Sequence, residues 1–217
     1  MLGLLAPTLI GVAAALALGG SPRALVATRI RGWPLVVATF AIELALYNPP
    51  VDRTPWAQAA GPWLWLATKV VLLTVLLWNA WPERRHVVWP WAVAACGVAL
   101  NALVIAANYG HMPQSAEAAA AVWGASRIDP TRLQNIVPMG PETVLPWLGD
   151  IFPQPRWLPR PNVVSIGDIL LALGVGAWAF IATLSNGDIT GRARRRIVGL
   201  TRLRLHGPAQ RPQRGSI

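Results

Sequence analysis

Two aspartates are the residues of this chain best suited to acid–base chemistry. Asp150 stands in the segment W-L-G-D-I-F-P, and Asp168 ends the segment N-V-V-S-I-G-D, which leads into a long apolar run. Two carboxyl groups that lie close together share a proton, so that one acts as a base, the other acts as an acid, and the pair can activate a water molecule. An aspartyl hydrolase with Asp150 and Asp168 as its catalytic residues is therefore one hypothesis.

Each aspartate also has a structural explanation. Ser165 stands three residues before Asp168, which is the spacing of a capping box, and an acid is favoured near a helix N-terminus. Asp150 follows a glycine and could shape a turn, or bind an arginine of its own loop such as Arg156 or Arg160. We favour the structural roles, and the hydrolase is the alternative.

One acidic and one basic residue lie within apolar segments. Glu43 stands four residues before the end of the segment 33–47, and Lys69 stands eight residues into the segment 61–81. If these segments cross a membrane in opposite directions, both charges fall in its outer half. An unpaired charge at that depth is costly, so we predict that Glu43 and Lys69 form an ion pair. A transporter with a proton or ion pathway through this pair is the alternative.

Other polar residues are candidates for binding or for helix packing. Asn101 and Asn108 are seven residues apart, so they share one face of a helix, where an amide usually bonds to a neighbouring helix. The remaining candidates are His111, Asn162 and Ser165. The sequence has no cysteine–histidine spacing typical of a metal site and no glycine-rich phosphate loop, so we predict neither a metal nor a cofactor.

The elements that must position these residues are strongly apolar. Of the 217 residues, 54% are hydrophobic and only 13% are charged, which is unusual for a soluble domain. A helix of about 20 residues crosses the hydrocarbon core of a bilayer. Five segments have suitable composition and length, and they predict an all-α integral membrane five-helix bundle within residues 1–185: 2–18, 33–47, 61–81, 87–107 and 163–184.

The segment 109–162 is too long to be a passive connection. Near its start, Ser115 can cap a short helix that the following alanines favour. Later prolines favour extended or turning backbone. Apolar side chains in this second part predict that it folds back over the outer end of the helices: Ile136, Val137, Val144, Leu145, Trp147, Leu148, Ile151 and Phe152.

Tryptophans indicate two aromatic belts at the membrane surfaces. The chain has 12 tryptophans, and an indole ring is typically found at headgroup depth in membrane proteins. The predicted inner belt holds Trp33, Trp78, Trp81, Trp89 and Trp91, and the predicted outer belt holds Trp56, Trp63 and Trp65.

Basic residues predict the orientation in the membrane. With the N-terminus outside, the segments 19–32, 82–86 and 185–217 are cytoplasmic and contain thirteen of the arginines, against five in the outer segments. This distribution follows the positive-inside tendency. It predicts an outer loop at 109–162 and a cytoplasmic C-terminus.

The basic tail, residues 186–217, has two interpretations. It is either a plain stop-transfer charge cluster or an interfacial segment whose arginines bind anionic lipid headgroups on the cytoplasmic face. Nucleic acid is not a predicted partner, because the charge lies where membrane topology already requires it. The candidate lipid-binding residues are Arg192, Arg194, Arg195, Arg196, Arg202 and Arg204. The end of the tail has a composition typical of disorder.

Three short motifs carry a resemblance to a known family. They are N-x-G-x-M-P at 108–113, L-G-D-I at 148–151 and S-I-G-D at 165–168. With these motifs, most of residues 1–185 resembles a family of small bacterial polytopic membrane proteins that is known as a domain of unknown function. The resemblance implies a fold and a location in the bacterial inner membrane, and it implies no activity.

The last third of the chain also resembles lipoprotein signal peptidase, an aspartyl peptidase of the bacterial inner membrane. In that family, an acid-and-phenylalanine segment is followed by F-N-x-A-D and a final helix. Here D-I-F-P is followed by N-V-V-S-I-G-D and a final apolar segment. Six residues instead of three separate Asn162 from Asp168, and the peptidase motif G-N-x-x-D-R is missing. The resemblance therefore implies a shared architecture.

Together these patterns predict a non-enzymatic polytopic membrane protein. Its outer loop would serve in assembly, as part of an accessory subunit, or in small-ligand binding. The predicted partners are the lipid bilayer, anionic lipids and other membrane proteins.

Overall fold

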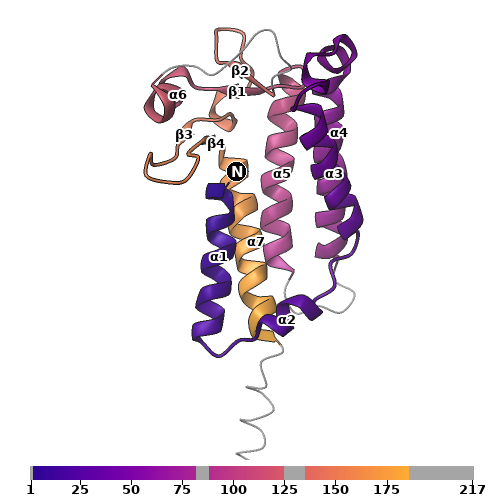
Figure 1. The fold of residues 1–217 in the computed structure, drawn as a ribbon, viewed down its shortest axis with the longest axis vertical. Coiled ribbons are helices and arrows are strands. Elements are labelled where there is room, and N and C mark those ends of the chain that lie inside the picture. The colour runs from indigo at the N-terminus through magenta and orange to yellow at the C-terminus, as the bar shows by residue number, and fades with distance from the viewer. Residues whose placement is uncertain (1, 82–87, 125–134, 186–217) are drawn as a thin grey trace, which may run out of the picture.

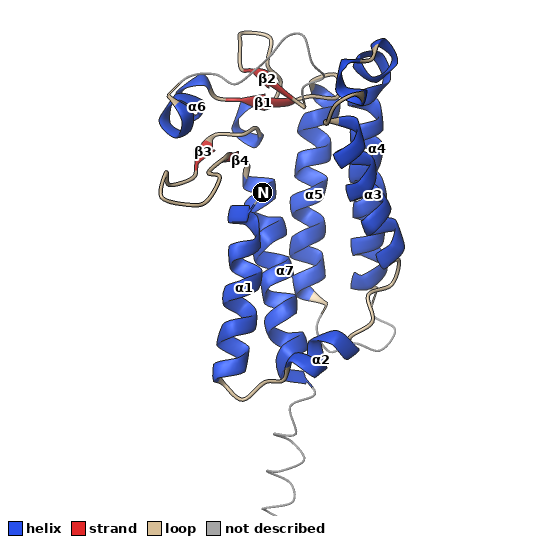
Figure 2. Cartoon of the chain, in the orientation of Figure 1, coloured by secondary structure: helices blue, strands red, loops and turns tan. Residues whose placement is uncertain are grey.

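A computed structural model describes residues 2–81, 88–124 and 135–185 (Figure 1). These residues form seven α-helices, two 3-10 turns and four short strands (Figure 2). The helices are α1 (Leu2–Ala17), α2 (Pro22–Ala27), α3 (Trp33–Leu46), α4 (Pro55–Ala80), α5 (Trp89–Ala107), α6 (Ala116–Trp123) and α7 (Ile166–Ser185). The 3-10 turns are η1 (Val51–Arg53) and η2 (Pro146–Leu148), and the strands are β1 (Met112–Gln114), β2 (Ile136–Pro138), β3 (Phe152–Pro153) and β4 (Val163–Val164).

The five longer helices form a row. α7 packs between α1 and α5, α5 packs against α4, and α4 packs against α3, so α1 and α3 lie at the two ends of the row (Figure 1). The short helix α2 packs on α7 at the end of the molecule opposite to α6. Three helices, α4, α5 and α7, are long and apolar enough to cross a membrane, and α1 and α3 are apolar but shorter.

Two helix starts differ from the prediction. α4 begins at Pro55 instead of Gly61, because a proline suits the first position of a helix, where its missing amide hydrogen is not needed. α7 begins at Ile166 instead of Val163, because residues 163–164 pair with β3 as strand β4. Helix α2 was not predicted, and the predicted start of α5, Val87, lies outside the described residues.

The described part of residues 109–162, here called the cap, covers one end of the row (Figure 1). Within it, β1 pairs with β2 in parallel, and β3 pairs in antiparallel fashion with β4, which directly follows the cap. The predicted short helix is present as α6, and the Ser115 hydroxyl accepts a hydrogen bond from Ala118 N at 3.2 Å. The strands are too short for hydrophobic alternation to reveal them in the sequence.

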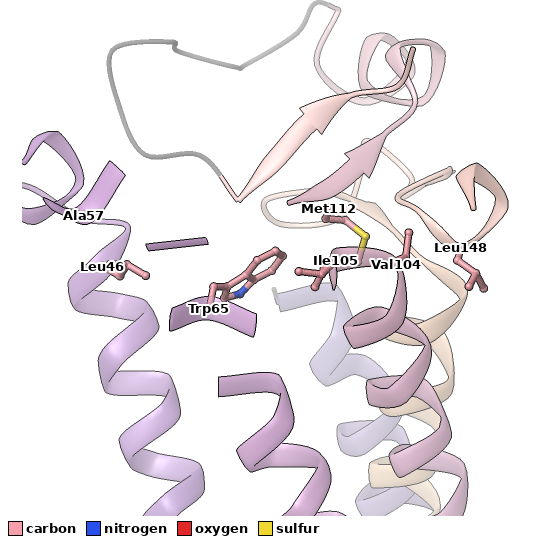
Figure 3. Packing of buried hydrophobic residues seen from close by; sticks show 7 residues of the cluster. All are labelled: Leu46, Ala57, Trp65, Val104, Ile105, Met112 and Leu148. Atoms are coloured by element: carbon pink, nitrogen blue, oxygen red, sulfur yellow. The ribbon is translucent and has the colours of Figure 1, made fainter. Parts of the chain in front are cut away.

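A buried apolar cluster joins the cap to α3, α4 and α5 (Figure 3). Trp65 points from α4 toward Ile105 of α5, and Met112 and Leu148 add to the cluster from the cap. The cluster consists of Leu46, Ala57, Trp65, Val104, Ile105, Met112 and Leu148. The prediction that the cap folds back is therefore confirmed, with Leu148 buried and Ile136 and Leu145 packed on the cluster.

Several aromatic side chains lie elsewhere than predicted. Trp147 and Phe152 are exposed on the cap, as is Val144, although we predicted that they pack on the helices. Conversely, Trp65 and Trp91 are buried in the helix row, although we assigned them to belts. Composition reveals that tryptophan is abundant, but which face of a helix carries each ring depends on the packing partners. The exposed belt tryptophans are Trp33, Trp56, Trp63, Trp78, Trp81 and Trp89.

Candidate functional site

The candidate site lies where α5, the first turn of α7 and the cap meet. α5 and α7 approach closely because Gly97 faces Gly167. A Cβ atom on Gly167 would collide with Asn101 Oδ1 and would lie 2.5 Å from Gly97 O. Since neither glycine has a side chain, the two backbones pack together and Asn101 lies directly against the start of α7.

Asn101 connects the two helices through its amide. Its Nδ2 donates a hydrogen bond to Asp168 Oδ1 at 2.8 Å, and its Oδ1 accepts one from Ser165 Oγ at 2.8 Å. Asn101 and Ser165 are both buried. The interhelical hydrogen bond that we predicted for this asparagine is therefore present, and its partners are the candidate residues Ser165 and Asp168.

The predicted capping box forms at the start of α7. Ser165 Oγ accepts a hydrogen bond from Asp168 N at 3.0 Å, and Ser165 N donates one to Asp168 Oδ2 at 3.4 Å. With the bond from Asn101, both carboxylate oxygens of Asp168 accept hydrogen bonds. Amide donors and the N-terminal end of the helix dipole both stabilise the charged form of a carboxylate.

Asp150 is held in the cap by its backbone. Asp150 N donates to Pro113 O at 2.8 Å, and Ser115 N donates to Asp150 O at 2.9 Å, so the residue is bridged to the strand β1. Its side chain is 7% exposed. Within the part of the chain that the structure describes, Asp150 Oδ1 has no hydrogen-bond partner.

The surroundings of Asp150 disfavour its negative charge. Burial raises the pKa of Asp150 well above its usual value, the negative charge of Asp168 raises it further, and a hydrogen bond from the Gln114 side chain opposes these effects. The structure thus brings Asp150 into the electrostatic range of Asp168. We suggested Arg156 as a partner of Asp150, and this is wrong. The Arg156 guanidinium instead donates to Ala121 O of α6 at 2.6 Å.

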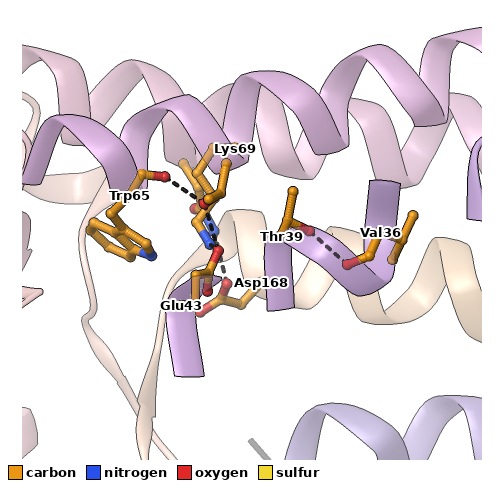
Figure 4. A network of polar contacts seen from close by, with 8 residues as sticks. Val36, Thr39, Glu43, Trp65, Lys69 and Asp168 are labelled. Carbon is orange, nitrogen blue, oxygen red and sulfur yellow. Dashed lines mark hydrogen bonds and ion pairs between the residues drawn. The ribbon is translucent and has the colours of Figure 1, made fainter. Parts of the chain in front are cut away.

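Glu43 and Lys69 form the second polar site (Figure 4). Lys69 Nζ lies 2.7 Å from Glu43 Oε1, and the same oxygen accepts a hydrogen bond from Thr68 Oγ1 at 2.6 Å. Lys69 Nζ also lies 5.0 Å from the centre of the Trp65 ring, within the range of a cation–π contact. The structure therefore brings these two charges together between α3 and α4.

The two polar sites lie at a similar depth in the helix row. Trp65 of α4 packs in one cluster with Val104 and Ile105 of α5. One turn along each helix from this contact lie Thr68 on α4 and Asn101 on α5, both buried. Polar side chains of α3, α4, α5 and α7 therefore lie at one depth of the helix row, just below the cap.

The remaining candidate residues hold the cap itself together. Asn108 Nδ2 donates to Val144 O at 2.8 Å, and Asn108 Oδ1 accepts from Val144 N at 3.0 Å, so this asparagine bonds to the cap and not to a neighbouring helix as predicted. His111 N donates to Asn108 O at 3.1 Å. Asn162 exchanges hydrogen bonds with Gln154 between the strands β3 and β4.

Sequence reasoning missed Gln114, Thr68 and the Gly97–Gly167 contact. Gln114 is buried beside Asp150, but a single glutamine in a loop carries no periodic signal. The glycine of S-I-G-D was noticed only as part of a motif. Its role depends on Gly97, which is 70 residues away in the sequence.

The described residues bear on metal binding but not on the predicted lipid-binding arginines. In the described ranges, no group of three or more His, Cys, Asp or Glu residues could hold a metal ion. The predicted lipid-binding arginines lie outside the described residues: Arg192, Arg194, Arg195, Arg196, Arg202 and Arg204.

Comparison with known protein families gives a match. The model of a family of unknown function, DUF5317, matches residues 27–181. Neither the curated proteins nor the solved structures contain a match to the chain.

Proposed function

The chain belongs to this family of unknown function, and we propose that it is a non-enzymatic, multi-pass protein of the bacterial cytoplasmic membrane whose cap binds another membrane protein. The family match confirms the resemblance that the three sequence motifs indicated. It covers α3, α4, α5, the cap and most of α7. The proposed role is that of an accessory subunit in a larger membrane assembly.

In the proposed topology, α1, α3, α4, α5 and α7 cross the bilayer. The start of α1 points toward the cap and the end of α7 lies at the opposite end of the row, which agrees with an outer N-terminus and a cytoplasmic tail (Figure 1). The positive-inside distribution supports the same orientation. In this arrangement the cap lies at the outer surface, and the tail reaches anionic lipids on the cytoplasmic side.

Membrane-impermeant thiol labelling tests this topology. In a Cys96→Ala background, a cysteine replaces Glu142 in the cap or Gln210 in the tail. We expect labelling of Glu142→Cys in intact cells, and labelling of Gln210→Cys only after permeabilisation. Labelling of Gln210→Cys in intact cells would contradict the topology.

One observation favours a binding role for the cap. Tyr109 is 80% exposed, and its backbone has φ +56°, a left-handed conformation that a tyrosine rarely adopts. The Asn108–Val144 hydrogen bonds hold this backbone next to α5, and Trp147 is 62% exposed in the same part of the cap. Large exposed aromatic side chains are frequent at protein-binding surfaces, and a rarely adopted backbone conformation often marks a functional position.

Native gel electrophoresis of membranes in mild detergent tests this role. We expect the wild-type chain to migrate in a complex larger than its own detergent-bound monomer. The variant Tyr109→Asn with Trp147→Ala should migrate as the free chain, and asparagine keeps the left-handed backbone accessible. Trp63→Ala, which removes an exposed tryptophan from α4, is the matched control and should leave the complex intact. Wild-type protein that migrates only as the free chain would rule out the accessory role.

The aspartyl hydrolase is the second candidate, because the charge of Asp168 acts on Asp150, and one oxygen of Asp150 has no hydrogen-bond partner among the described residues. Two observations weigh against it. Both oxygens of Asp168 are occupied by structural hydrogen bonds, and the comparisons lend no support to the resemblance to lipoprotein signal peptidase. Loss of peptide hydrolysis in Asp150→Asn and Asp168→Asn variants that still fold would establish the hydrolase instead.

A transporter with a pathway through Glu43 and Lys69 is less well supported. The lysine ammonium is engaged by the Glu43 carboxylate and the Trp65 ring, and Thr68 binds the same carboxylate. These contacts suit a fixed structural ion pair between α3 and α4.

A further inference from the structure

The hairpin that leads from the cap into α7 exposes an indole ring near the start of this apolar helix. We propose that this hairpin, residues 152–164, is a lipid anchor. Trp157 lies among the phospholipid headgroups of the leaflet on the side of the cap, and Arg160 binds their phosphate groups. The inference rests on the proposed membrane placement of α7, and it goes further because it assigns a lipid contact to a segment outside the helix row.

The depth of the hairpin follows from the length of α7. This helix has 20 residues and is therefore about 30 Å long, which equals the thickness of the hydrocarbon core of a bilayer. In the proposed topology, both ends of α7 lie at the boundary between hydrocarbon and headgroups. Strand β4 ends at Val164, two residues before the helix begins at Ile166, so the hairpin starts at headgroup depth.

Helix α1 begins at the same level as α7. A Cβ atom on Gly11 of α1 would lie 2.5 Å from Gly176 O of α7, so the two helices are in contact at these glycines. Gly11 follows Leu2 by nine residues and Gly176 follows Ile166 by ten residues, so the two helices start at one level. The hairpin reaches down to this level and projects past the start of α1, away from α5 (Figure 1). It therefore lies where lipid surrounds the end of the row.

Hydrogen bonds fix the shape of the hairpin. Next to the paired strands, Gln154 N donates to Asn162 O at 2.9 Å, and Asn162 N donates to Gln154 Oε1 at 3.1 Å. Trp123 Nε1 of α6 donates to Pro161 O at 3.1 Å. The Arg156 guanidinium donates to two carbonyl groups near the end of α6. Because α6 and both strands hold the hairpin, its tip is presented in a defined place.

The tip of the hairpin carries the side chains that suit a headgroup contact. Trp157 is 80% exposed, and Arg160 is exposed and has no partner within the described part of the chain. An indole ring is favoured at headgroup depth because it combines an apolar body with a polar N–H group. A guanidinium binds phosphate through two parallel N–H groups. Residues 151–167 contain no acidic residue, so no carboxylate of this segment competes with lipid phosphate for Arg160.

Electron paramagnetic resonance of a spin label beside Trp157 tests the anchor. The full chain with Cys96→Ala carries the label at Pro159→Cys, an exposed position whose replacement keeps Trp157 and Arg160. The protein is reconstituted at low density in vesicles of phosphatidylcholine and phosphatidylglycerol. A label in lipid collides more often with dissolved oxygen, and less often with a water-soluble nickel complex, than a label in water does.

Two other labelled positions give the reference values. Leu9→Cys replaces an exposed leucine of α1, and its label should report hydrocarbon. Glu142→Cys replaces an exposed residue of the cap outside the hairpin, and its label should report water. We expect the ratio of oxygen to nickel collisions for Pro159→Cys to lie between these two values, as it does at headgroup depth.

Variants of the tip then test the two side chains. Trp157→Ser should lower the ratio for the Pro159→Cys label to the value for Glu142→Cys, and an unchanged ratio would overturn the role of Trp157. Arg160→Gln should lower the population ratio of immersed to water-exposed label about fivefold, which is the contribution of one basic residue near an anionic surface. Arg53→Gln, an exposed arginine of η1 outside the hairpin, is the matched control and should leave this ratio unchanged. Equal effects of Arg160→Gln and Arg53→Gln would overturn the phosphate contact.

The reference labels distinguish failure of the anchor from failure of the proposed topology. If the Pro159→Cys label is as accessible to nickel as that of Glu142→Cys while Leu9→Cys reports hydrocarbon, the anchor is wrong and the membrane placement stands. If Leu9→Cys reports water, the topology and the anchor are both wrong. Spin–spin broadening between Pro159→Cys labels would also overturn the anchor, because it would assign the hairpin to a contact between two copies of the chain.

Discussion

The molecule holds two acidic sites at similar depth in the helix row, and the carboxyl groups at the two sites have different hydrogen-bond partners. At the Glu43 site, a lysine ammonium lies 2.7 Å from the carboxylate and a hydroxyl group completes the contact. At Asp150 and Asp168, the hydrogen-bond donors among the described residues are neutral: the Asn101 amide, the Gln114 amide and the Ser165 backbone. The first site joins two helices, and the second joins two helices and the cap.

This difference shows what each kind of site is suited for. A carboxylate that is paired with a fixed cation keeps its structure as long as both partners are present, so it suits a permanent contact between α3 and α4. At the second site, a side-chain amide and a backbone N–H group donate to the Asp168 carboxylate, so this site fixes the start of α7 against α5.

The largest expected effect comes from breaking the Glu43–Lys69 pair. Lys69→Leu leaves the Glu43 carboxylate without its cation, and we expect a loss of about 3–5 kcal/mol in the free energy of unfolding. The double variant Glu43→Leu, Lys69→Leu should regain most of this loss, because no lone charge is left. A double-mutant cycle in detergent measures both. Additive effects of the two single variants would show that the pair contributes nothing as a pair.

A smaller effect is expected at the neutral donors of the second site. Asn101→Leu removes the hydrogen bonds to Asp168 and Ser165, and hydrogen bonds to a charged group contribute about 1.5–3 kcal/mol. We expect a loss of this size in the free energy of unfolding. Asn48→Ala, which removes an exposed amide that bonds only locally to Leu44 O, is the control and should have little effect. Equal losses in both variants would argue against a special role of Asn101.

The capping residue of α7 comes next. Ser165→Ala removes the hydroxyl that accepts from Asp168 N and donates to Asn101, and the loss of a helix cap costs about 1 kcal/mol. Thermal unfolding of Ser165→Ala is compared with that of Ser185→Ala, a control at the other end of the same helix. The difference in melting temperature measures the effect of the cap. We expect Ser165→Ala to be clearly the less stable of the two, and the reverse order would contradict the capping role.

The smallest expected effect concerns the exposed hydrogen bonds between α5 and the cap. Asn108→Ala removes two bonds to the backbone of Val144, and because these bonds are exposed we expect a loss of about 0.5–1 kcal/mol. Hydrogen exchange at the Val144 amide should rise, while the amides of Asp150 and Ser115 should keep their protection. A general loss of protection throughout the cap would mean that Asn108 holds the whole cap in place.

The helices and the local caps could be predicted from the sequence because their causes are local. Runs of apolar residues indicated α1, α3, α4, α5 and α7, although a proline at the first position moved the start of α4 to Pro55. Ser115 and Ser165 were recognised as caps because a cap bonds to amides only three residues away. The four short strands could not be predicted, because each depends on a partner from another part of the chain.

The sequence by itself therefore determined which residues carry charge within apolar surroundings, and that Glu43 and Lys69 need a partner there. Only the tertiary structure decided what surrounds Asp150. Gly97 and Gly167 let α5 and α7 approach, which places Asn101 against Asp168, and β1 brings Gln114 beside Asp150. These contacts join residues that lie far apart in the chain, and no local pattern records such distances.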